Sequence, residues 1–161
     1  MKKSIMLMWL LALAAVVIAQ SDNDKWRGTW QWVSGADTFT IQLQKETIHA
    51  PTGDIIDCIV GWHRYVKNGI EIENSMQHTG TAWAMGKHTI MGGLDGSAKL
   101  YLTTVRDITL AKRVEAVLTI NPSYTQALWV LREPRGIRIV DSNAPPRGTF
   151  TLPKELTLTK L

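Results

Sequence analysis

Apolar and polar side chains alternate along much of the chain beyond residue 27. The alternation is clearest where Phe39, Ile41 and Leu43 are separated by threonine and glutamine. In an extended strand successive side chains point to opposite faces, so this pattern predicts strands with one buried and one exposed face. The same period recurs over residues 100–104, 114–120, 149–152 and 156–159.

Two segments, 55–66 and 127–131, are apolar on both faces. Strands that are covered on both sides have this composition, so we expect these two in the middle of a sheet or across a closed interior. Turn sequences separate the apolar runs at short intervals, and Asn68-Gly69 is the strongest of them because both residues tolerate a positive φ.

The runs predict about eight or nine strands, near residues 27–33, 37–46, 54–67, 70–76, 88–91, 98–105, 108–120 as one strand or two, 126–132 and 149–160. No window shows an apolar stripe at helical spacing, so the fold class is all-β. A single antiparallel meander of about eight strands hides its edges by closing into a barrel. We expect the glycine-rich segment 80–96 to be a flexible connection, with a lid over an open barrel end as the alternative.

The N-terminal segment has the order of a secretory signal. Lys2 and Lys3 precede an uncharged apolar run from Ile5 to Ile18, and Ala19 completes a small-residue cleavage site. The run is shorter than the roughly 18 to 20 residues that a membrane-spanning helix needs. We therefore expect a signal peptide at 1–19, a domain at 20–161, no membrane span after cleavage, and a secreted or periplasmic location without a lipoprotein cysteine.

Composition and charge narrow the class of protein. With 45% hydrophobic residues and one cysteine in 161 residues, the chain is neither disordered nor a disulfide scaffold. Without residues 1–19 it carries 16 basic and 14 acidic side chains, and residues 98–161 carry 10 basic and 5 acidic ones. The densest basic segment, 132–147, lies among Pro, Gly and Asn, which indicates a solvated loop and no nucleic-acid partner.

Candidate catalytic and metal-binding residues lack the spacing that such chemistry requires. His49, His63, His78 and His88 form no zinc motif, and the apolar neighbours of Cys58 indicate a buried thiol. We expect no metal, no cofactor and no catalytic residue.

Glycosidase chemistry requires two carboxylates that face each other across a cleft, and the sequence contains two acidic pairs. Glu71 and Glu73, and likewise Asp54 and Asp57, are too close in sequence to face each other across a cleft, so a solvated face is expected. His63 is the histidine that needs a partner, and Glu71 or Glu73 could reach it across the Asn68-Gly69 hairpin, most simply as a structural cross-strand pair.

The start of the first strand resembles that of lipocalins. Gly28-Thr29-Trp30 is a G-x-W sequence at the entrance to an up-and-down meander. The resemblance implies a lipocalin-like (calycin-type) barrel in which Trp30 plugs one end and a basic residue of the last strand, here Lys160, lies over the indole.

The chain also resembles a more specific family. It contains G-T-W-Q-W at 28–32, D-T-F-T-I-Q-L-Q-K at 37–45, D-C-I-V-G-W-H-R-Y-V-K-N-G-I-E-I-E-N-S at 57–75 and F-T-L-P-K-E-L-T-L-T-K at 150–160. These are similar to a group of small secreted bacterial proteins catalogued as a domain of unknown function. The chain departs from the group at His63, where an aromatic ring is expected, and in lacking a lipoprotein cysteine.

Two functional hypotheses come from different classes. The first is an exported, non-enzymatic lipocalin-like domain that binds a small apolar or amphipathic ligand in its interior, with Trp62, Tyr65, Trp83 and Trp129 as the lining. The alternative is a structural or protein-interaction domain of the cell envelope with a filled barrel, whose 132–147 segment contacts another protein. A hydrolase assembled from scattered residues is the third hypothesis and the least favoured.

The signal-peptide assignment gives a first prediction. Exported protein is expected to start at or near Gln20, because the lysine, apolar and small-residue order of 1–19 directs cleavage there. Intact-mass measurement of the exported chain checks this, and a mass that retains the apolar segment would contradict it.

Overall fold

The computed structural model describes residues 24–50, 52–94, 98–135 and 145–161. These residues form nine strands: β1 (Gly28–Ser34), β2 (Asp37–His49), β3 (Ile55–Lys67), β4 (Ile70–Asn74), β5 (Ile90–Leu94), β6 (Lys99–Asp107), β7 (Lys112–Ile120), β8 (Gln126–Arg132) and β9 (Glu155–Lys160). Three short 3-10 helices accompany them: η1 (Asp24–Trp26), η2 (Met76–His78) and η3 (Trp83–Met85). The described ranges contain no α-helix, and no helix in them could span a membrane. The all-β prediction is confirmed.

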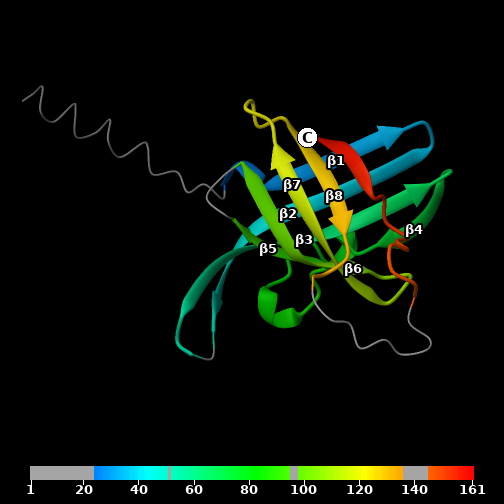
Figure 1. The fold of residues 1–161 in the computed structure, drawn as a ribbon. Coiled ribbons are helices and arrows are strands. Elements are labelled where there is room, and N and C mark those ends of the chain that lie inside the picture. The colour runs from blue at the N-terminus through cyan, green and yellow to red at the C-terminus, as the bar shows by residue number, and fades with distance from the viewer. Residues whose placement is uncertain (1–23, 51, 95–97, 136–144) are drawn as a thin grey trace, which may run out of the picture.

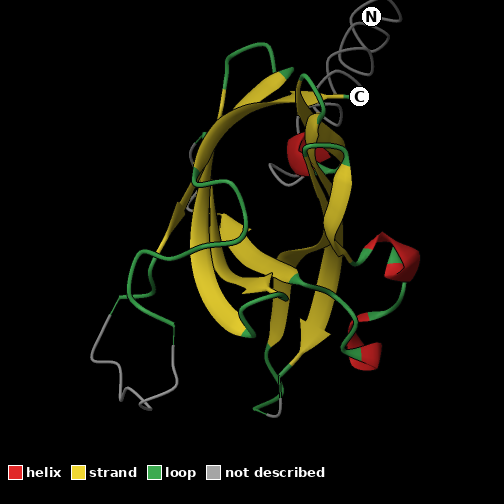
Figure 2. Ribbon diagram, turned by 90° about the vertical axis from the view of Figure 1, so that its right-hand side faces the viewer, coloured by secondary structure: helices red, strands yellow, loops and turns green. Residues whose placement is uncertain are grey.

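Eight of the strands close into an antiparallel barrel, as predicted; Figures 1 and 2 show the closed ring. The sheet order is β2-β1-β9-β8-β7-β6-β5-β3-β4, and pairing of β2 with β3 completes the ring. β4 is a ninth strand that pairs with β3 and takes no part in the closure. Since the strands meander, the β6–β7 turn and the start of β9 lie at one end of the barrel, and the β7–β8 turn and the start of β1 lie at the other.

The barrel is filled by its own side chains. The core comprises 21 buried residues, and Phe39, Leu118 and Trp129 among them have no exposed surface. Phe39 packs edge-on against both Trp129 and Tyr65, with ring centres 5.1 and 6.1 Å apart. A void large enough for water would leave accessible surface on the side chains around it. These central aromatic and leucine side chains therefore border no such void.

Trp30 closes the β7–β8 end. Its indole Nε1 donates a hydrogen bond to the Trp26 carbonyl at 2.9 Å, and both rings are fully buried. Lys160 Nζ lies 5.2 Å from the centre of the Trp30 ring and donates to the Lys25 carbonyl at 2.7 Å. Gly28 has a φ of +112°, a conformation that side chains disfavour. This is the arrangement that the lipocalin resemblance implies for Gly28, Trp30 and Lys160.

Two strand glycines let neighbouring backbones approach closely. A Cβ on Gly61 would lie 2.4 Å from the Gln42 carbonyl oxygen, and one on Gly92 would lie 2.1 Å from the Tyr101 carbonyl oxygen. Such contacts are prohibitive, so β3 and β5 can curl at these points only with glycine. Part of the glycine-rich 80–96 segment is thus the barrel strand β5 rather than a flexible connection, while residues 95–97 lie outside the described ones.

Two segments expected as strands are not strands. Residues 108–111 form the β6–β7 turn, and residues 149–154 precede β9 and are not part of a strand, although the Lys154 carbonyl accepts from the Leu131 N–H at 2.8 Å. Two backbone groups of the second segment bond to side chains: the Thr151 N–H donates to Asp107 at 2.7 Å, and the Pro153 carbonyl accepts from Trp129 Nε1 at 3.0 Å. The threonine alternation at 149–152 therefore does not mark a strand.

The Trp30 plug gives a prediction for stability. Trp30→Ala should lower the free energy of unfolding by about 3 to 5 kcal/mol, because a large core aromatic is lost. Leu128→Ala is a control, since Leu128 is 39% exposed on β8 and its loss should cost less than about 1 kcal/mol. Chemical denaturation measures both, and equal small shifts would show that Trp30 is not a plug.

Candidate functional site

A buried polar network lies on β3. This strand pairs with β2 along one edge, and along its other edge it pairs first with β5 and then with β4. Along that edge Gly61 pairs with Ile90 of β5, whereas Arg64 pairs with Asn74 of β4. The fork is the point on β3 at which pairing with β5 ends and pairing with β4 begins. His63 lies at the fork, and its side chain is 0% exposed. The backbone groups at the fork need partners because unpaired buried polar groups are costly.

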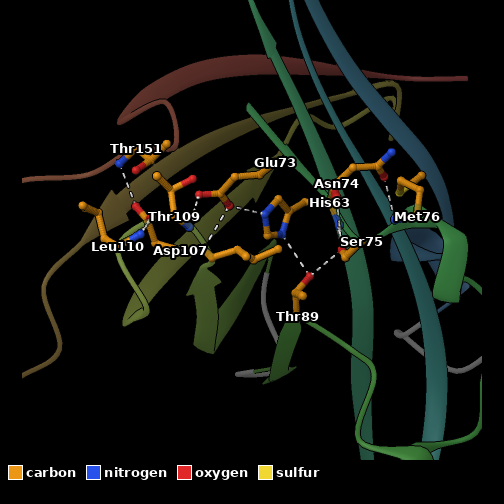
Figure 3. A network of polar contacts seen from close by, with 11 residues as sticks. His63, Glu73, Asn74, Ser75, Met76, Thr89, Asp107, Thr109, Leu110 and Thr151 are labelled. Carbon is orange, nitrogen blue, oxygen red and sulfur yellow. Dashed lines mark hydrogen bonds and ion pairs between the residues drawn. The ribbon is translucent and has the colours of Figure 1, made fainter. Parts of the chain in front are cut away.

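Ser75 and Thr89 supply the partners on one side (Figure 3). Ser75 Oγ accepts from the His63 N–H at 2.9 Å, and the Ser75 N–H donates to the His63 carbonyl at 2.9 Å. Ser75 Oγ is also 3.0 Å from Thr89 Oγ1, which lies 2.9 Å from His63 Nδ1. These contacts replace the regular ladder at the fork.

Glu73 is the partner on the other side of the imidazole. Its Oε2 lies 2.8 Å from His63 Nε2. A carboxylate can only accept, so Nε2 carries the proton and Nδ1 faces the Thr89 hydroxyl. Glu73 is thus the one of the two expected glutamates that reaches His63. Glu71 instead pairs with Arg64 at 2.6 Å on the surface.

Glu73 also binds the β6–β7 turn. The N–H groups of Ile108 and Thr109 donate to its two oxygens at 3.1 and 2.9 Å. Burial would raise the pKa of Glu73, but the hydrogen bonds from His63, Thr109 and Ile108 outweigh burial and lower the pKa to about 2. The carboxylate is therefore ionised at neutral pH and holds the turn against the fork.

Asp107 extends the network toward the start of β9. It is 0% exposed and accepts from the N–H groups of Leu110 at 3.1 Å and Thr151 at 2.7 Å. Lys112 is also buried and pairs with Glu133, and it donates to the Thr149 carbonyl at 3.1 Å. Polar side chains thus close the β6–β7 end, as Trp30 closes the other.

The expectation of a solvated acidic face is wrong for Glu73. Glu71 and Glu73 would share one face of a regular strand, but the β3–β4 register shifts between Tyr65 and Val66. The shift turns Glu73 inward and leaves Glu71 exposed.

In this network a hydroxyl group (Thr89) contacts an imidazole (His63), which contacts a carboxylate (Glu73). A nucleophile, a general base and the acid that orients the base are connected in the same order in some enzymes. The imidazole, however, has no exposed surface, and Ser75 Oγ already contacts both backbone groups of His63. Thr89 is 6% exposed and is engaged by His63 and Ser75. The contacts are those of a structural network.

A groove lies outside the barrel beside this network. It has a volume of about 1030 Å³ between the segment 74–89, which carries η2 and η3, and the β6–β7 hairpin. Its walls include Ser75 and Thr89 from the network, Trp83 and Lys87 from the covering segment, and Arg106, Arg113 and other residues of the hairpin. Polar and apolar atoms contribute similarly to its surface, and none of the described lining residues is Asp or Glu.

The four aromatic residues expected to line the interior are divided between two places. Tyr65 and Trp129 belong to the barrel core. Trp62 points to the outer face of β3, where it packs with Cys58 and Val60 under the partly buried Trp83. The expectation that all four line one interior surface is therefore wrong, because the 74–89 segment covers the outside of β3 and buries that face as well. Trp83 alone of the four borders the groove.

The remaining candidate residues are dispersed. His49 is exposed on the β2–β3 hairpin, and His78 and His88 line the groove. No cluster of three or more potential metal ligands occurs in the described residues. Burial, followed by the charges of Glu46 and Asp57, raises the pKa of Cys58, so its thiol stays protonated. Asp57 pairs with Lys45 at 2.8 Å, and Asp54 accepts from Thr52 at 2.7 Å.

Sequence reasoning missed the groove and several buried residues. Trp26 and Asp107 are fully buried without any pattern that singles them out. Arg106 and Arg113 come together only through the β6–β7 register, in which they are direct partners. The signal that could have found them is the hairpin itself, since a turn centred on 109–110 places these two positions opposite each other.

The ionised Glu73 gives a prediction for pH dependence. Because its folded pKa of about 2 lies below the unfolded value, about 4.3, its contribution is complete above roughly pH 5 and is lost as pH falls toward 2. Glu73→Gln should cost about 3 kcal/mol at pH 7, and the difference from the native protein should shrink between pH 5 and pH 2. Denaturation curves across this range measure it.

Glu71→Gln is the matched control on the same strand, and its effect at pH 7 should be small because the pair with Arg64 is exposed. A Glu73→Gln effect that stays constant from pH 7 to pH 2 would contradict the assigned ionisation.

Comparison with known proteins places the chain in a family. A family model described as "Family of unknown function (DUF6705)" matches residues 1–161, which is the whole chain. No curated protein and no solved structure matches it. The match agrees with the resemblance to a domain of unknown function, and the lipocalin likeness is suggested by the barrel. The chain belongs to the DUF6705 family of unknown function.

Proposed function

We propose that this protein is an exported, non-enzymatic binding domain whose barrel is a scaffold and whose ligand lies in the external groove. Residues 1–19 are removed on export, and residues 20–161 form the domain. The observation that carries the proposal is the contrast between a barrel filled by its own side chains and an open groove of about 1030 Å³ beside it. Sites for small molecules are concave and carry a few convergent polar groups.

Hydrogen bonds and aromatic packing hold the covering segment 74–89, which forms one wall of the groove. Thr89 and Ser75 anchor both ends of the covering segment to β3 through the His63 network. Trp83 packs on the outer apolar cluster and stacks on His88, with ring centres 4.1 Å apart. A wall that is ordered before binding lowers the entropy that a ligand must overcome.

The packing supports an external site better than an interior one. An apolar ligand in the barrel would have to displace side chains such as Phe39 and Trp129, which are fully buried. The sealed position of His63 supports a non-enzymatic role. The filled barrel also agrees with a protein-interaction domain, but residues 136–144 of the segment expected to contact a partner lie outside the described residues.

The test is a titration with four compounds that share a phenyl ring and differ in charge: phenyl phosphate, benzoate, benzamidine and benzyl alcohol. We expect at least one to shift the backbone NMR signals of Gln77, Lys87 and Arg113, which line the groove, while the methyl signals of Leu118 and Leu158 in the core stay in place. Shifts that begin at the core methyl groups, or no shifts at the groove with any compound, would overturn the proposal.

Two tryptophan substitutions separate the groove from the rest of the surface. Ala84→Trp fills the groove from η3 without changing its charge and should weaken binding at least tenfold. Thr157→Trp, on the exposed face of β9 outside the groove, is the matched control and should bind as the native protein does.

A further inference from the structure

The described residues that line the groove carry a net positive charge. Lys87, Arg106 and Arg113 line it, and none of the three forms an ion pair within the described residues. Lys112 also lines it, but Glu133 neutralises that charge. Burial and the nearby Arg106 lower the pKa of His88, so this ring adds no charge at neutral pH.

The nearby acidic side chains lie outside the lining of the groove. Glu73 and Asp107 lie beneath the groove with their oxygens occupied by N–H donors and the imidazole. Glu46 is outside the lining, where the Trp83 N–H approaches one of its oxygens at 3.5 Å. The described lining of the groove therefore presents three unpaired cations and no carboxylate to a ligand.

Arg106 and Arg113 are placed at a cost to the fold. They are direct cross-strand partners on β6 and β7, and both are exposed. Like charges opposite each other in a sheet repel and destabilise the strand pair. An anion held between the two guanidinium groups would reduce that repulsion. Each guanidinium group is planar and can donate two parallel hydrogen bonds to phosphate oxygens.

Resting on the function proposed above, we propose that the groove binds a small molecule that carries a phosphate monoester. Arg106 and Arg113 hold the phosphate oxygens, and Lys87 approaches from the opposite wall. Three cations match a dianion better than a single carboxylate. The Trp83 side chain borders the same groove and offers an apolar surface to the rest of the ligand.

The four phenyl compounds test this assignment by charge. Phenyl phosphate is expected to bind at the groove at least tenfold more tightly than benzoate, and benzamidine and benzyl alcohol should bind more weakly still. Its affinity should fall as salt is added. If benzoate, benzamidine or benzyl alcohol shifts the groove signals at equal affinity, the phosphate assignment is overturned while groove binding stands. If no compound shifts them, both proposals fail.

The double variant Arg106→Gln with Arg113→Gln tests the residues. It should weaken phenyl phosphate binding at least tenfold, whereas Arg132→Gln, which removes the same kind of charge from β8 outside the groove, should change it less than twofold. Phenyl phosphate binding that survives in the double variant overturns the proposal.

Stability distinguishes lost recognition from lost folding. Removal of the like-charged pair should leave the melting temperature of the ligand-free double variant equal to or above that of the native protein. Weakened binding with an undiminished melting temperature supports the proposal. If the double variant melts below the native protein, the pair is structural and the proposal is overturned.

Discussion

The fork in β3 is the constraint on which the rest of the structure depends. A strand that pairs with β5 at Gly61 and with β4 at Arg64 leaves buried backbone groups between the two partners. Each such group would cost about 1 to 3 kcal/mol if it were left unpaired. Ser75 pairs with the backbone of His63, and the His63 ring joins Thr89 to Glu73. One network thereby fixes β4, the covering segment and the β6–β7 turn against the barrel.

That network explains why a solid barrel can have an open site beside it. The interior is occupied by core side chains, and the segment that leaves β4 must cross the outer face of β3 before it returns as β5. Its two ends are tied down by Ser75 and Thr89, so it stands as a wall facing the β6–β7 hairpin. The hairpin supplies Arg106 and Arg113 for the other wall. The same elements thus serve folding and the proposed binding, but the network side chains His63 and Glu73 are buried, whereas Arg106 and Arg113 are exposed.

Much of the fold could be predicted from local pattern. The alternation of apolar and polar residues in β2 and β7 predicted the barrel strands, because strand burial depends on side-chain periodicity. The G-x-W sequence predicted the Trp30 plug, which depends on the positive φ of Gly28. The short Asn68-Gly69 hairpin predicted a partner for His63 at Glu71 or Glu73, and the structure shows that it is Glu73. The burial of Glu73 could not be predicted, since it depends on a register shift in β4. The outward position of Trp62 depends on an irregular segment folding over it, and the pairing of Arg106 with Arg113 depends on register, so neither is visible in composition or spacing.

Native-state amide hydrogen exchange at the β6–β7 turn tests the central claim, that buried Glu73 ties this surface turn to the fork in β3. The N–H groups of Ile108 and Thr109 donate to Glu73, so they should exchange nearly as slowly as amides in the middle of β7, although the turn itself lies at the surface. Exchange of these two amides as fast as that of the exposed residues in the β7–β8 turn would contradict the account.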